Sequence, residues 1–201
     1  NHEGEIAYSM KMIEGHTLKE LIQESRQHYE SRGRSAGQHA LNELLEHFLK
    51  VCDAMEYAHQ KGIIHRDLKP ANIVLGDFGE TAVIDWGLAK LVDSSDDSDA
   101  SDLRLHFEGE TAVGAVLGTY SYMPPEQARG EPATPASDVY ALGVMLYQVL
   151  TGKLPYNAAK AVDIFFMHIR DPLPTFSAPL PGIDTVQTEA LQALIHSAMA
   201  K

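Results

Sequence analysis

Residues 65–72 read His65-Arg66-Asp67-Leu68-Lys69-Pro70-Ala71-Asn72, and a second polar stretch downstream reads Asp85-Trp86-Gly87. Two longer stretches follow in the same chain, Gly118-Thr119-Tyr120-Ser121-Tyr122-Met123-Pro124-Pro125-Glu126 and Ser137-Asp138-Val139-Tyr140-Ala141-Leu142-Gly143. A chance occurrence of all these stretches, in this order and at this spacing, is negligible. Together they decide which fold the sequence predicts.

These stretches resemble the motifs of eukaryotic-type protein kinases. Residues 65–72 match the family's H-R-D-L-x-x-x-N catalytic loop, and residues 118–126 resemble its G-T-x-x-Y-M-A-P-E, with Pro124 in place of Ala. Lys69 is the variant that resembles Ser/Thr rather than Tyr kinases, and the D-W-G stretch resembles that of many bacterial members. The resemblance implies a mainly α fold (α+β overall), namely the helical C-terminal lobe of a kinase with short β-hairpins around the catalytic loop.

The resemblance also implies a reaction, the transfer of the ATP γ-phosphoryl group to a Ser/Thr hydroxyl of a protein substrate, with ATP and Mg²⁺ as cofactors. Asp67 would orient the hydroxyl and accept its proton, and Lys69 would steady the transferred phosphoryl group. Asn72 and Asp85 would ligate magnesium, which prefers oxygen donors. The alternative is a non-catalytic, pseudokinase-like binding module, although a scaffold has no physical need for all of these residues.

A literal D-F-G occurs at Asp77-Phe78-Gly79, upstream of Asp85. It lies between two short runs that favour β-strands, Ile73-Val74-Leu75 and Thr81-Ala82-Val83-Ile84. We therefore expect residues 76–80 to form the turn of a hairpin. Asp85, which ends the second run, is the residue that matches the family's magnesium-binding Asp.

Residues 5–18 resemble the last strand of the kinase small lobe and the hinge. The resemblance implies that the adenine base would bond with the carbonyl of Lys11 and the amide of Ile13. Met10 would be the gatekeeper, and Val74 would lie under the ring. For Met10 and Val74, ordinary core packing is the alternative.

Neither a Gly-rich phosphate loop nor a Val-Ala-x-Lys strand occurs before His65. We therefore expect residues 1–13 to be a remnant of the small lobe and residues 14–201 to be a large lobe that is incomplete at its C-terminus. The chain on its own is expected to be inactive, because nothing in it would cover the phosphates.

The resemblance also implies regulatory residues. An Arg directly before the catalytic Asp, in this chain Arg66, receives an activation-loop phosphate, and Thr111 resembles the phosphothreonine of bacterial kinases. Thr119 would contact Asp67 and Lys69 and help to select Ser/Thr substrates. Residues 93–110 begin with an acidic, Ser-rich run, so we expect a disordered insert there.

Three further residues are expected to have architectural roles rather than catalytic ones. His65 would pack into the regulatory core, and Asp138 would bond with the backbone of the catalytic loop. Glu126 would pair with an Arg that this family places C-terminal to the position of Lys201.

Apolar spacing predicts the helices that carry these residues. Thr17 and Glu20 form a capping-box pattern, and residues 41–55 follow the spacing of a long amphipathic helix. A buried helix over residues 139–150, ending near Gly152, and helices over 157–169 and 188–199 complete the set. Residues 27–39 show no periodicity, so we expect a loop.

Composition limits the remaining possibilities. A hydrophobic content of 44% fits a globular domain, and no apolar run is long enough to span a bilayer, so we expect a cytoplasmic domain without a membrane segment. The formal net charge of −12 argues against binding to nucleic acid. Cys52 is the only cysteine, which excludes an internal disulfide. The oligomeric state stays open.

Overall fold

The computed structural model describes residues 14–32, 34–91, 120–175 and 183–201, and of residues 28–32 and 34–40 it describes the backbone alone. The helices are α1 (Leu18–Arg32), α2 (Arg34–Gln60), α5 (Pro125–Ala128), α6 (Pro135–Thr151), α7 (Ala161–Arg170) and α8 (Thr185–Ala198). The strands are β1 (His16–Thr17), β2 (Ile63–Ile64), β3 (Ile73–Leu75), β4 (Thr81–Val83) and β5 (Lys90–Leu91), with short 3₁₀ helices at η1 (Pro70–Asn72) and η2 (Trp86–Leu88). The predicted mainly α fold with short strands is confirmed.

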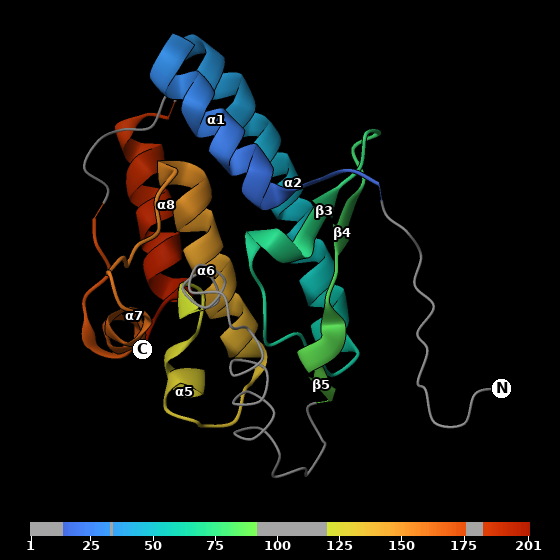
Figure 1. Ribbon diagram of the computed structural model, residues 1–201, viewed down its shortest axis with the longest axis vertical. Coiled ribbons are helices and arrows are strands. Elements are labelled where there is room, and N and C mark those ends of the chain that lie inside the picture. The colour runs from blue at the N-terminus through green and yellow to red at the C-terminus, as the bar shows by residue number, and fades with distance from the viewer. Residues whose placement is uncertain (1–13, 33, 92–119, 176–182) are drawn as a thin grey trace, which may run out of the picture.

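The first two helices lie against each other as a long pair that extends beyond the other helices (Figure 1). The predicted capping box begins α1, where the Thr17 amide donates to Glu20 Oε2 at 2.7 Å and the Glu20 amide donates to Thr17 Oγ1 at 3.3 Å. These bonds lower the pKa of Glu20. They satisfy amide groups that a helix leaves unpaired at its first turn.

The prediction of a loop over residues 27–39 is wrong. Helix α1 runs to Arg32 and α2 starts at Arg34, so nearly all of this segment is helical. Its Gln, Glu, Arg and Ala residues have good helix propensity. The segment forms the outer end of the α1–α2 pair, beyond the other helices (Figure 1), and apolar periodicity marks only the helix turns that face a core.

The core forms where α2 and α6 meet. Leu44, Val51 and Met55 of α2 are buried with Val144 and Met145 of α6. The predicted buried helix is confirmed in α6, which ends at Gly152 with a left-handed φ of +66°. The outer side of α6 packs on α8. The helices predicted over 157–169 and 188–199 are present as α7 and α8, with ends shifted by a few residues.

The strands form two small antiparallel sheets, one in the order β1-β3-β4 and the other pairing β2 with β5. The predicted hairpin is confirmed: Ile73 pairs with Val83, and the turn between β3 and β4 contains Gly79 at a φ of +80°. Phe78 at its tip is 94% exposed. The literal D-F-G is therefore the turn of a hairpin.

Helix α2 holds this hairpin from the side. His47 Nδ1 lies 2.8 Å from the Thr81 hydroxyl, and Lys50 Nζ donates to the Gly79 carbonyl at 2.8 Å. The same helix ends just before β2, which leads into residues 65–72. Among the described helices, none combines the length and apolar character that crossing a bilayer requires.

Candidate active site

The loop between β2 and η1 brings Asp67, Lys69 and Asn72 together. Lys69 Nζ lies 2.8 Å from Asp67 Oδ2. The side-chain nitrogen of Asn72 donates to the Asp67 carbonyl at 2.8 Å and to Asp67 Oδ2 at 3.0 Å. Asp67 and Asn72 are buried, and Lys69 is 13% exposed. The carboxylate is therefore held in one orientation by an ammonium group and an amide.

The β3–β4 hairpin brings Asp85 to the same place. The amide of Ile84 donates to the carbonyl of Asn72 at 2.9 Å, and Asp85 follows directly. Asp85 is exposed and has a left-handed φ of +63°. Because the Asn72 nitrogen is engaged by Asp67, the amide oxygen is the donor atom that the Asn72 side chain can offer to a cation. Amide and carboxylate oxygens are the donors that magnesium prefers, so these two residues fit that ion.

His65 and Trp86 support the backbone that leads into Asp85. His65 is fully buried, and its Nε2 lies 3.1 Å from the Ile84 carbonyl oxygen. Its ring packs on the Trp86 indole, with centroids 4.6 Å apart and ring planes inclined at 55°. The indole nitrogen of Trp86 donates to the Val83 carbonyl at 3.0 Å. The carbonyls of the two residues before Asp85 therefore both have side-chain partners.

Asp138 of α6 bonds with the backbone of the catalytic loop, which is the contact that the resemblance implied. The carboxylate is 1% exposed and accepts the His65 amide at 2.9 Å and the Arg66 amide at 3.0 Å. His59, at the end of α2, places Nε2 2.8 Å from Asp138 Oδ2. No pattern in the sequence singled out His59, because this contact joins residues 79 positions apart.

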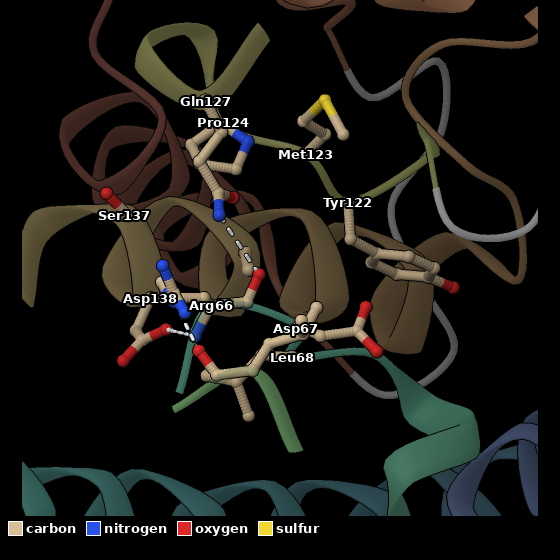
Figure 2. A pocket seen from close by; sticks show the side chains of 11 residues that line it. Arg66, Asp67, Leu68, Tyr122, Met123, Pro124, Gln127, Ser137 and Asp138 are labelled. Carbon is tan, nitrogen blue, oxygen red and sulfur yellow. Dashed lines mark hydrogen bonds between the residues drawn. The ribbon is translucent and has the colours of Figure 1, made fainter. Parts of the chain in front are cut away.

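Gln127 of α5 is a second contact that sequence reasoning missed. Its side-chain nitrogen donates to the Arg66 carbonyl at 3.2 Å (Figure 2). Arg66 has a left-handed φ of +69°, and its guanidinium Nε donates to the Leu88 carbonyl. Arg66, Asp67, Gln127 and Asp138 line one pocket between α5, α6 and the catalytic loop.

Comparison with known proteins agrees with this geometry. The family model of the protein kinase domain matches residues 2–200. The chain belongs to the protein kinase family. Over 156 residues (75% of this chain and 16% of the relative) it is 41% identical to the serine/threonine-protein kinase PknD of Protochlamydia amoebophila. Over 193 residues (96% and 26%) it is 35% identical to the serine/threonine-protein kinase PknB of Mycobacterium tuberculosis.

A third relative, the serine/threonine-protein kinase PknD of Chlamydia caviae, is 42% identical over 168 residues, which cover 81% of this chain and 18% of the relative. The chain thus spans between 16% and 26% of the length of these kinases. The catalytic loop, the hairpin and Asp85 described above all lie within the match to the kinase family model.

In this kinase fold Glu126 is bonded within the described residues. The Ser137 hydroxyl donates to Glu126 Oε1 at 2.6 Å and accepts the Thr134 amide at 2.9 Å. Ser137 thus both caps α6 and ties α5 to it. Nearby, the Tyr122 hydroxyl donates to Gln148 of α6, and burial raises the pKa of Tyr122.

The remaining predicted site residues are placed only in part. Val74 is buried in β3, paired with Thr17 on one side and Ala82 on the other. The predicted roles of Met10, Lys11, Ile13, Thr111 and Thr119, and the predicted disorder of residues 93–110, lie outside the described residues.

Proposed function

We propose that the protein is an ATP-dependent serine/threonine kinase that phosphorylates protein substrates. One observation carries this proposal: Asp67, Lys69 and Asn72 contact one another, and the residue before Asp85 bonds through its backbone with Asn72. The names of the relatives, all serine/threonine-protein kinases, support the same function.

Asp67 would act on the substrate hydroxyl. Its carboxylate is buried and held by Lys69 and Asn72, so it is oriented before the substrate arrives. It would accept a hydrogen bond from the hydroxyl and take the proton as the oxygen bonds to the γ-phosphorus and the bond from that phosphorus to the bridging oxygen breaks, with ADP as the leaving group. Lys69, whose ammonium group lies next to that carboxylate, would neutralise charge on the transferred phosphoryl group.

Asn72 and Asp85 would hold magnesium through their side-chain oxygens. The ion would neutralise the phosphate oxygens of ATP and hold them in one orientation. Met10, Lys11, Ile13 and Val74 would contact the adenine base.

Regulation would act through Arg66, which would bind a phosphate on Thr111, while Thr119 would help to select the substrate hydroxyl. His65, Glu126 and Asp138 would have architectural roles. Because ATP is a cytoplasmic nucleotide, we place the kinase domain in the cytoplasm.

The test is phosphoryl transfer by the full-length protein. Purified protein is incubated with γ-labelled ATP, magnesium and a generic basic protein, and labelled residues are identified after acid hydrolysis. We expect phosphoserine and phosphothreonine in the wild-type reaction and almost none with Asp67→Asn. A wild-type protein that binds a partner but transfers no label would instead establish the non-catalytic binding module.

A further inference from the structure

Gln127 connects the short helix α5 to the backbone of the catalytic loop. We propose that Gln127 is a positioning residue for phosphoryl transfer, which orients Asp67 by holding the carbonyl group of Arg66. This inference rests on the proposed kinase function and deepens it, because it adds a residue that controls the geometry of the proposed base.

The catalytic loop needs such support because Arg66 has an unfavourable backbone conformation. Arg66 and Asp85 are the non-glycine residues with positive φ in the described part of the chain, at +69° and +63°. A side chain with a β-carbon disfavours this region, so surrounding contacts must maintain it. The residue directly after Arg66 is Asp67, and any relaxation of Arg66 would change the direction of the Asp67 side chain.

On its N-terminal side, Arg66 is held by α6. The two carboxylate oxygens of Asp138 accept the amides of His65 and Arg66, and His59 bonds with the same carboxylate. These contacts fix where the loop enters the turn. In the next peptide group, the one that joins Arg66 to Asp67, the Asp67 amide donates to His65 Nδ1 at 3.3 Å. The carbonyl of that peptide group, which belongs to Arg66, needs a partner of its own.

Gln127 supplies that contact. The Arg66 carbonyl belongs to the peptide group that leads into Asp67, and it accepts the Gln127 side-chain amide at 3.2 Å. A carbonyl only accepts hydrogen bonds, so the amide of Gln127 must present its nitrogen to it. Because the peptide group is planar, fixing its carbonyl also fixes the N–H and Cα of Asp67. Figure 2 shows Arg66 bonded on one side to Gln127 and on the other to Asp138.

The position of Gln127 is itself well defined. The residue is 7% exposed, which restricts its side chain. Its neighbour Glu126 accepts the Ser137 hydroxyl of α6 at 2.6 Å, so α5 is tied to the same helix that carries Asp138. Helix α5 begins at Pro125, inside the stretch 118–126 that resembles the G-T-x-x-Y-M-A-P-E motif. Gln127 thus makes the orientation of Asp67 dependent on the position of α5.

The test uses Gln127→Met, which keeps the side-chain length and removes the donor, and Gln127→Glu, which replaces the donor by an acceptor. Gln60→Met is the matched control, since Gln60 is exposed at the end of α2 and its side-chain nitrogen donates to Glu56, one turn earlier in the same helix. In the full-length protein we expect both Gln127 variants to lower kcat by about 10- to 100-fold, with KM for ATP changed by less than about 3-fold, as for a misplaced catalytic group. Gln60→Met should match the wild type.

A second readout does not depend on activity. Amide hydrogen exchange, followed by mass spectrometry of peptides that cover residues 63–69, should be faster in Gln127→Met than in the wild type or Gln60→Met. Wild-type kcat in both Gln127 variants would overturn the inference. It would also be overturned if the variants lost activity only in proportion to their fraction of unfolded protein, while hydrogen exchange over residues 63–69 stayed as in the wild type. If the wild type itself transfers no phosphate, the proposed function fails, while hydrogen exchange still tests the contact.

Discussion

The side-chain nitrogen of Asn72 donates to both the carbonyl and the carboxylate of Asp67, at 2.8 and 3.0 Å. One planar amide therefore links the proposed base to the proposed metal site, because its nitrogen bonds with Asp67 and its oxygen is the proposed magnesium ligand. A change in the orientation of Asp67 would be transmitted to the metal ligand. The two functions cannot be altered independently at this position.

The assignment of the metal site to Asp85 can be tested against the literal D-F-G. Asp85→Asn should lower phosphoryl transfer by about 10²-fold or more, since it removes the negative charge of the one carboxylate among the two proposed magnesium ligands. Asp77→Asn is the matched control and should be nearly silent, because Asp77 is exposed in the hairpin turn. Steady-state rates at several magnesium concentrations are the measurement. An inactive Asp77→Asn beside an active Asp85→Asn would contradict the assignment.

Asp67 and Asp85 would act in the same step, which predicts non-additive losses. The double variant Asp67→Asn, Asp85→Asn should be far less impaired than the product of the two single effects. Single-turnover rates of the three variants provide the comparison. Fully multiplicative losses would show that the two residues act independently.

The indole N–H of Trp86 makes a bond that phenylalanine could not make. Trp86→Phe keeps a ring on His65 but removes the donor to Val83, so Asp85 should be held less firmly. We expect the magnesium concentration for half-maximal activity to rise about 3- to 10-fold, as for the loss of one neutral hydrogen bond. Phe78→Leu, at the exposed hairpin tip, should leave it unchanged. Equal magnesium dependence in Trp86→Phe and the wild type would rule out this role for the indole.

Regulation through Arg66 predicts that Thr111→Ala and Arg66→Ala lower activity to a similar extent and without further loss when combined. Deleting residues 93–102 should matter little, because the serines there are flanked by aspartates that repel a phosphate, so they are poor candidates for the phosphorylated residue that binds Arg66. Mass spectrometry of the active protein shows which hydroxyls are phosphorylated. A fully active protein with Thr111 unmodified would remove the basis for this mechanism.

His168 of α7 predicts how stability depends on pH. The imidazole is fully buried, with Nδ1 2.9 Å from the Tyr140 hydroxyl and its ring 4.9 Å from that of Tyr156. Burial, with a smaller effect of Lys201, lowers the pKa of His168 to about 4. As pH falls, His168 therefore binds a proton in the unfolded chain before it does so in the folded protein. The free energy of unfolding that depends on neutral His168 is complete above about pH 6.5 and is lost toward pH 4.

By pH 5 this loss should reach about 2 kcal/mol. Urea unfolding at pH 7 and pH 5 measures it, and His168→Gln should show a smaller difference between the two pH values. Burial also lowers the pKa of His47, so part of the acid dependence should persist in that variant. An identical pH dependence in the variant and the wild type would exclude His168 as its source.

Local features of this fold could be predicted from the sequence, whereas a distant contact could be predicted only where the family resemblance implied it, as for Asp138 and the catalytic-loop backbone. The hairpin around Asp77 followed from two β-prone runs on either side of a glycine-containing turn, and the Thr17–Glu20 cap followed from residues one turn apart. The helical backbone over residues 27–39 was missed, since apolar periodicity marks a face that packs on a core and this sequence shows no such face. Gln127 and His59 contact residues 61 and 79 positions away, so no window of sequence could reveal them.

The contacts of α2 have a consequence for movement. This helix leads through β2 into the loop with Asp67, and through His47 and Lys50 it also holds the hairpin that leads to Asp85. Any shift of α2 therefore carries the proposed base and the proposed metal ligand in the same direction, and their spacing is preserved. A shift of α5 acts through Gln127 on Asp67, and through Asp67 on Asn72, but it does not carry the hairpin that leads to Asp85. Displacements of these two helices thus have different effects. A shift of α2 moves the proposed base and the proposed metal ligand together, whereas a shift of α5 changes their spacing.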